Sequence, residues 1–219
     1  MKNNKVRIIT FSGVDGAGKT TILTEFSRIL ATKYQENIVF LRHRPSILPI
    51  LSAIKHGRKK ASEKTMESLP RTGGNKSKLS SYIRFFYYLT DFILGQWIVY
   101  FKYSLNGKII IYDRYYFDFI FDSRRSNIDL SEGFVSFFYR FVFKPEMNIF
   151  LYADPDIILQ RKQELDKQTI EKLTQKYVSF FNKQKNNKQY ICIENIDISD
   201  TLEHIEKIYS EKIGKGENA

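Results

Sequence analysis

Residues 13–20 read Gly13-Val14-Asp15-Gly16-Ala17-Gly18-Lys19-Thr20, and this stretch decides the fold. It matches the pattern G-x-x-x-x-G-K-[ST] at every fixed position. The apolar run Val6–Phe11 predicts a buried strand before it, and apolar residues at helical spacing over Lys19–Tyr34 predict a helix after it. A strand, a glycine-rich turn and a helix in this order are typical of a P-loop, which binds the phosphates of a nucleoside triphosphate.

The residue types of this turn suit phosphate binding. Its glycines allow backbone N–H groups to face phosphate oxygens, and the following helix adds the partial positive charge of its N-terminus. We expect Lys19 to reach the β and γ phosphates of ATP and the Thr20 hydroxyl to ligate Mg²⁺. The expected nucleotide contacts are Gly13, Asp15, Gly16, Ala17, Gly18, Lys19, Thr20 and Thr21.

Further apolar runs and helical patterns extend this unit into a complete α/β domain. Four more strands are expected over Asn37–Leu41, Lys108–Tyr112, Asn148–Tyr152 and Gln189–Ile193. Helices are expected over Leu79–Leu105, Glu132–Phe143, Asp156–Glu164, Lys167–Lys183 and Asp200–Lys212. The alternation predicts a doubly wound five-stranded parallel sheet with helices on both faces. We expect residues 1–219 to form a single domain, with a basic flexible insertion at about 52–80 and a short lid at about 161–172.

Composition and charge limit the classes of protein to which the chain can belong. Of its 219 residues 42% are hydrophobic and 27% charged, which excludes a disordered or fibrous chain. A net charge of +11 suits an anionic partner such as phosphate, nucleic acid or a membrane surface. No helix-turn-helix, RNP or zinc signature is present, so we expect no specific nucleic-acid partner. One cysteine and the absence of a signal-peptide pattern lead us to expect a cytoplasmic protein.

Two aromatic-rich segments need separate interpretations. Phe85–Phe101 is apolar except for Asp91, but it is short for a membrane span and has a charge at its midpoint. We expect a core helix there, without membrane insertion, and Phe86 is its candidate contact with a bound acceptor. Phe134–Phe143 is apolar almost all round its helix, so it either covers the sheet or forms an interface between two copies of the chain.

Charged residues follow the predicted strand at Lys108–Tyr112. Asp113 stands where Mg²⁺ and the γ-phosphate meet in open α/β sheets, and Arg114 is able to clamp a phosphate with two parallel hydrogen bonds. A GTPase would carry N-K-x-D after a late strand, whereas Asn182–Lys185 lacks the aspartate and lies at a helix end. These residues favour a kinase.

Together these features resemble the thymidylate kinase family of P-loop nucleoside monophosphate kinases. Phe11–Thr21 is similar to the first strand and P-loop of that family, and Asp113-Arg114-Tyr115 is similar to its D-R-Y/H motif. Pro145–Pro155 followed by Arg161 resembles its fourth strand and the helix that opens its lid, and Glu194–Asp197 resembles the turn after its last strand. The resemblance spans nearly the whole chain in the right order.

The resemblance implies a role for each matching residue. Lys19, Asp113 and Arg114 would be catalytic, Thr20 and Asp113 would hold Mg²⁺, and Arg161 would contact ATP. The residues expected to contact a small-molecule phosphate acceptor are Asp15, Arg42, Arg44, Phe86, Arg114, Tyr115 and Arg124. Which of Arg42 and Arg44 contacts the acceptor stays open, since the turn after the second strand departs from the R-E-P-G-G pattern of the family.

The acceptor side departs from the family more than the ATP side does. Phe92 stands where the family has an arginine that helps to read thymine, and no A-Y-Q follows the D-R-Y motif. The lid is poor in arginine, and the P-loop has Ala17 where an arginine would compensate. We therefore expect an ATP-dependent kinase of dTMP or a similar nucleoside monophosphate. One alternative is a P-loop kinase of another small acceptor such as a polysaccharide sugar. A second is a non-catalytic ATP-binding module attached to nucleic acid or membrane.

Overall fold

The structure is a computed structural model that describes residues 6–45, 47–48, 77–184 and 188–214. Its strands form one sheet and are β1 (Ile8–Ser12), β2 (Asn37–Arg42), β3 (Lys108–Asp113), β4 (Met147–Tyr152) and β5 (Tyr190–Glu194). Their order across the sheet is β2-β3-β1-β4-β5, and every neighbouring pair is parallel. The predicted five-stranded parallel sheet is confirmed, and β1, which leads into the P-loop, lies at its centre.

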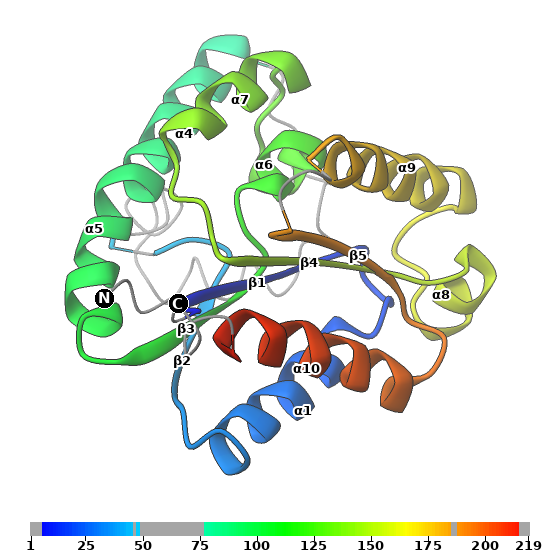
Figure 1. The fold of residues 1–219 in the computed structure, drawn as a ribbon. Helices are drawn as coiled ribbons and strands as arrows, with labels where there is room; N and C mark the ends of the chain where they lie inside the picture. The colour runs from blue at the N-terminus through cyan, green and yellow to red at the C-terminus, as the bar shows by residue number, and fades with distance from the viewer. Residues whose placement is uncertain (1–5, 46, 49–76, 185–187, 215–219) are drawn as a thin grey trace, which may run out of the picture.

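Helices cover both faces of the sheet, as Figure 1 shows. One face is covered by α1 (Lys19–Thr32) and α10 (Ile198–Gly214), and the other by α4 (Lys78–Thr90), α5 (Gln96–Val99), α6 (Phe117–Phe121), α7 (Glu132–Phe138) and α9 (Lys167–Lys183). The short helix α8 (Pro155–Arg161) follows β4. Because successive side chains of a strand point to opposite faces, Ile109 and Ile111 pack on the α1 side and Ile110 on the other.

The helix predicted over Leu79–Leu105 is one helical segment with two wide turns. Between α4 and α5 the residues Asp91–Gly95 form a π-helical turn, and Tyr100–Ser104 form a second one after α5. The first turn places the Asp91 side chain in the interior. Among the described residues no helix combines the length and the hydropathy that a membrane span requires.

The ends of other predicted segments also differ. The helix predicted over Glu132–Phe143 ends at Phe138 and continues as a 3₁₀ turn to Phe141. The predicted basic insertion lies outside the described residues except for 77–80, where Ser77 Oγ accepts a hydrogen bond from the N–H of Ser80 and caps α4. The predicted lid spans the end of α8, the loop 162–166 and the start of α9.

Exposed apolar side chains gather on α4, α5 and α7. On α7 Val135 is buried against the core, as a helix that covers the sheet requires, whereas Phe137 of α7 and Phe141 of the following 3₁₀ turn are exposed. The exposed apolar residues along the long helical segment are Leu79, Tyr82, Ile83, Phe86, Leu94, Trp97, Ile98 and Phe101. An interface between two copies of the chain stays a prediction.

Candidate active site

The P-loop joins β1 to α1, and two of its glycines show why the motif fixes them. Gly13 has φ +151°, and a Cβ there would lie 2.2 Å from the carbonyl oxygen of Leu151. Gly18 has φ +81°, and a Cβ there would lie 2.3 Å from the side-chain nitrogen of Asn195. The first turn of α1 carries no acidic residue. The first turn of α1 therefore adds no carboxylate that would compete with a phosphate at the helix N-terminus.

Lys19 places its ammonium group inside the P-loop. Its Nζ donates a hydrogen bond to the carbonyl oxygen of Val14 at 2.8 Å and lies 3.8 Å from Asp15. The side chain is only 7% exposed. Burial and, next, the charge of Arg114 lower the pKa of Lys19, the charge of Asp15 opposes both effects, and the resulting pKa is about 8. The ammonium therefore sits where added negative charge would stabilise it.

Arg114 joins the end of β3 to the P-loop. Its backbone is left-handed, with φ +76°, which is rare for a residue with a side chain and is a feature of functional sites. Its N–H donates to the carbonyl oxygen of Phe11 at 2.8 Å, so the turn is held against β1. Its guanidinium donates to Asp15 and, at 3.1 Å, to Asp118.

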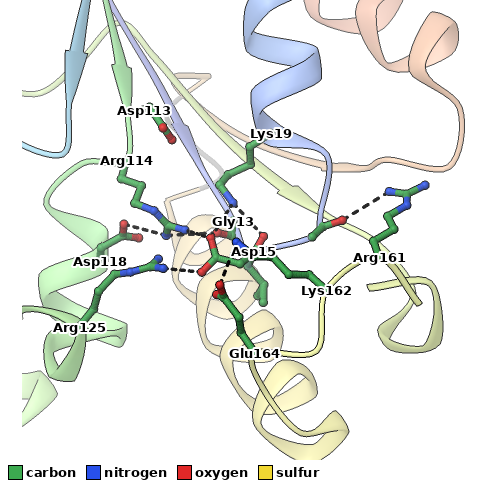
Figure 2. Close-up of polar contacts among 12 residues, drawn as sticks. Gly13, Asp15, Lys19, Asp113, Arg114, Asp118, Arg125, Arg161, Lys162 and Glu164 are labelled. Carbon is green, nitrogen blue, oxygen red and sulfur yellow. Dashed lines mark hydrogen bonds and ion pairs between the residues drawn. The ribbon is translucent and has the colours of Figure 1, made fainter. Parts of the chain in front are cut away.

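Two carboxylates face Arg114, that of Asp15, which is partly buried, and that of Asp118, which is fully buried (Figure 2). Burial alone would raise the pKa of Asp15, but the charges of Arg114, Lys19 and Arg125 hold that pKa well below its ordinary value. Burial opposes ionisation of Asp118 as well, but Arg114 and a hydrogen bond from the Tyr177 hydroxyl keep the pKa of Asp118 lowered. Both side chains are therefore ionised at neutral pH.

Asp118 and Tyr177 belong to this network, although neither was among the predicted site residues. Asp118, in the first turn of α6, follows Arg114 by four residues, and this spacing brings charged side chains together on one helical face. That spacing was a usable signal. Tyr177 lies on α9, far along the chain, and no local pattern connects it to the site.

Arg125 reaches the site, and its neighbour Arg124, which the sequence predicted, does not. Arg125 donates through Nη2 to Asp15 from the 3₁₀ turn that follows α6. Arg124 is exposed in the same turn. Successive residues in a tight turn point in different directions, so a pair of adjacent arginines does not reveal which one faces inward.

Tyr115 and Phe86 lie away from the cluster around Asp15. Tyr115 is fully buried, and its hydroxyl donates to the carbonyl oxygen of Phe143 at 2.9 Å and accepts from Gln96 at 3.1 Å. The prediction of Tyr115 as a substrate contact is therefore wrong: after the left-handed turn at Arg114, the next side chain enters the core. Phe86 is 45% exposed, and its ring contacts Phe85 of α4 and the aromatic side chains of α7.

The two arginines after β2 have different environments. Arg44 is buried, pairs with Asp91 and lies 5.0 Å above the ring of Tyr88. The other Asp91 oxygen accepts hydrogen bonds from the N–H groups of Ile47 and Leu48 at 3.0 and 3.2 Å. Arg44 and Asp91 thus hold the described part of the loop after β2. Arg42 is 90% exposed, and its Nε lies 3.8 Å from Asp113.

Phe92, at the position that departs from the family, is a core residue. It is fully buried, and its ring contacts those of Tyr115, Tyr116 and Phe119. It therefore exposes no surface with which to read a base. Beside it, the ring of His43 stacks on Phe119 with centroids 5.2 Å apart.

A cavity of about 290 Å³ opens beside the N-terminus of α1. It is lined by Gly18, Thr21, Arg161, Asn195, Ile196 and Ile198. Asn195 closes it toward the P-loop by donating to the carbonyl oxygen of Ala17 at 2.9 Å, and Arg161 Nη1 donates to that of Gly16 at 3.4 Å. The structure thus places Arg161 beside the P-loop, where the sequence predicted an ATP contact.

The groups predicted to hold Mg²⁺ are oxygen donors at the mouth of the site. Asp113 ends β3 with a partly exposed carboxylate, and Thr20 is exposed in the first turn of α1. No cluster of three or more His, Cys, Asp or Glu side chains suited to a metal occurs in the described part of the chain. Mg²⁺ commonly takes one or two protein ligands plus substrate phosphates, so this donor set fits the ion.

Comparison with known proteins places this geometry in a family. The sequence profile of the family described as thymidylate kinase matches residues 11–211. The chain belongs to the thymidylate kinase family. It is therefore a P-loop kinase, an ATP-dependent phosphotransferase that acts on dTMP or a similar nucleoside monophosphate. Neither the sugar kinase nor the non-catalytic module is favoured.

A solved structure shows the same fold. The thymidylate kinase from Ehrlichia chaffeensis superimposes on this kinase with a TM-score of 0.52 and 20% sequence identity, over 93% of this chain and 98% of that one. A search of curated proteins finds no match. The family uses ATP and Mg²⁺, which agrees with the phosphate-binding turn and the oxygen donors beside it.

Proposed function

We propose that this kinase transfers the γ-phosphate of ATP to dTMP, with Lys19, Arg114 and Asp113 as its catalytic residues. The observation that supports this most directly is the contact of Arg114 with Asp15. It brings an arginine from the D-R-Y motif on β3 to a P-loop that follows β1. An acceptor phosphate held by Arg114 would thus stand beside the γ-phosphate of ATP, and positioning is the larger part of catalysis in phosphoryl transfer.

On the ATP side, the P-loop N–H groups and Lys19 would hold the phosphates. The cavity beside Arg161 would take the adenine, because Ile196 and Ile198 offer apolar surface and Arg161 a planar guanidinium that stacks on aromatic rings. Thr20 and Asp113 would hold Mg²⁺, which neutralises charge on the β and γ phosphates.

On the acceptor side, Arg114 would bind the phosphate of dTMP and steady the charge during transfer. Asp15 would accept a hydrogen bond from an acceptor hydroxyl once its guanidinium partners turn to phosphates. Arg44 would act indirectly, because its pair with Asp91 holds the described loop after β2. We do not place the thymine ring on Phe92, whose side chain is buried.

A screen of acceptors tests this function. The kinase is incubated with Mg-ATP and, in turn, dTMP, dUMP, the ribonucleoside monophosphates and a set of bacterial sugars, and release of ADP is measured. We expect dTMP to give the highest kcat/KM. A sugar that outperforms every nucleotide would contradict the proposal, and so would ADP release that no acceptor stimulates.

Binding of Mg-ATP should take up protons near pH 8. In the free protein the pKa of Lys19 is about 8, so roughly half of the ammonium groups are deprotonated there. Bound phosphates favour the charged form and raise that pKa, so binding should take up as much as about half a proton. Calorimetry in two buffers of different ionisation enthalpy measures this number. The Lys19→Arg variant, whose guanidinium stays charged, should show no such uptake, and equal uptake in both proteins would contradict the assignment.

A further inference from the structure

Arg125 is held by an ordered turn. Its N–H donates to the carbonyl oxygen of Asp122 at 3.0 Å, and the N–H of Asn127 donates to that of Arg124 at 3.0 Å. Asn127 ends the turn in a left-handed conformation, with φ +55°. The direction of the Arg125 side chain toward the P-loop is therefore set by its backbone.

Only part of the hydrogen-bonding capacity of the Arg125 guanidinium is satisfied by the described residues. Nη2 donates to Asp15, whereas Nη1 is buried and has no hydrogen-bond partner among the described residues. A buried donor left without a partner costs free energy, typically about 1–3 kcal/mol. The parallel N–H groups of a guanidinium match two oxygens of a phosphate. In this structure Arg125 contacts one oxygen of the Asp15 carboxylate, which also accepts a hydrogen bond from Arg114.

The charges around Asp15 leave a positive excess. Among the described residues, the cations that pair with Asp15 are Lys19, Arg114 and Arg125, and the carboxylates paired with these cations are the partly buried Asp15 and the buried Asp118. Figure 2 shows Arg114 and Arg125 pointing toward Asp15 from one side and Lys19 from another. Three cations thus face two anions, and the excess suits a phosphate group.

On the other side of the P-loop, no described residue supplies a guanidinium to Asp15. Position 17 of the loop is an alanine, and Arg161 turns to the carbonyl oxygen of Gly16 beside the cavity. Lys162 is paired with Glu164 at 2.9 Å. Within the described residues, Arg125 and Arg114 are the arginines that contact Asp15.

We propose that Arg125 is a catalytic residue that binds the phosphoryl group in transfer; this inference rests on the proposed function. In the substrate-free protein Asp15 occupies its Nη2. With substrates bound, the guanidinium exchanges that oxygen for non-bridging oxygens of the γ-phosphoryl group. An acceptor phosphate oxygen then forms a bond to the γ-phosphorus, and the bond to the β–γ bridging oxygen breaks with its electron pair leaving on ADP. Arg125 keeps its proton and neutralises charge throughout.

The test compares Arg125→Ala and Arg125→Lys with Arg28→Ala, an exposed arginine of α1 that pairs with Glu25. We expect Arg125→Ala to lower kcat with dTMP by about 10²–10³-fold while the KM for ATP changes little. Arg125→Lys should recover part of this loss, and added guanidinium ion should restore part of the turnover of Arg125→Ala. Arg28→Ala should resemble the wild type.

A binding measurement separates this inference from the proposed function. Affinity is measured for Mg-ADP alone and for Mg-ADP with fluoroaluminate, which mimics the phosphoryl group in transfer. Arg125→Ala should bind Mg-ADP as tightly as the wild type does. The increase in its affinity when fluoroaluminate is added should be at least about tenfold smaller than in the wild type. The inference fails if Arg125→Ala keeps that gain in affinity. It also fails if Arg125→Ala loses Mg-ADP affinity by the same factor as turnover and melts at a lower temperature than the wild type, because Arg125 then has a structural role. Wild-type protein that binds fluoroaluminate normally but does not phosphorylate dTMP would contradict only the proposed acceptor.

Discussion

Replacing Lys19 with alanine should lower kcat for phosphoryl transfer by at least about 10³-fold. The ammonium lies inside the P-loop, 2.8 Å from the carbonyl oxygen of Val14. From there it would stabilise the negative charge on the γ-phosphate during transfer. The fold should survive, because Asp15 keeps its two arginine partners. Steady-state assays of ADP release measure the effect, with the melting temperature as a check on folding.

Lys33→Ala is the matched control for this variant. Lys33 is an exposed lysine just beyond the last turn of α1, and its partner is Glu206 on α10. Its removal should leave kcat unchanged, since exposed ion pairs contribute little to stability. Lys19→Ala protein that retained more than a tenth of wild-type turnover would show that the P-loop ammonium is not catalytic.

Replacing Arg114 with alanine should remove both activity and stability. Activity should fall by at least about 10³-fold, because Arg114 is the proposed clamp for the acceptor phosphate. The free energy of unfolding should fall by about 3–5 kcal/mol, because breaking a buried pair leaves Asp118 charged, 1% exposed and without its main partner. Urea unfolding and ADP release measure the two effects separately. Full turnover in the variant would exclude the clamp.

The loss of stability should depend on pH in a defined direction. The fold lowers the pKa values of Asp118 and Asp15, so their ionised forms stabilise the native state above their ordinary pKa of 3.8 and lose that effect as pH falls below it. The difference in unfolding free energy between wild type and Arg114→Ala should therefore be largest near neutrality and become smaller as the pH falls below 3.8.

A double variant separates the two roles of Arg114. In Arg114→Ala/Asp118→Asn the buried carboxylate is replaced by a neutral amide, so part of the lost stability should return. Phosphoryl transfer should not return, because the guanidinium is still missing. A double variant no more stable than Arg114→Ala would show that the pair with Asp118 is not what stabilises this turn.

Local patterns predicted most of the fold. The P-loop and the five apolar runs are short segments whose structure is determined by a few neighbouring residues. The buried isoleucines Ile109–Ile111 of β3 are an example. The π-helical turn at Asp91–Gly95 was not predictable in the same way. Its first residue, Asp91, is buried in a pair with Arg44, which comes from a distant part of the chain. Helical spacing alone predicts an unbroken helix there.

The same distinction applies to the site. Lys19 and Thr20 follow from the motif, and Asp113 with Arg114 follows from the end of a strand. Tyr115 was predicted to contact the acceptor but lies in the core, because an apolar strand pattern does not indicate the left-handed backbone of Arg114 before it. Side-chain direction in a tight turn is set by backbone angles, and these are settled by packing against other elements.

The central position of β1 also bears on how the protein is made. Its neighbours in the sheet are β3 and β4, which come from residues far later in the chain. A ribosome must therefore synthesise the chain through Tyr152, and release that segment from its exit tunnel, before β1 is paired on both sides. Until then the nascent chain contains the P-loop sequence but has not formed the phosphate-binding site. Its unpaired apolar strand β1 is then prone to aggregation.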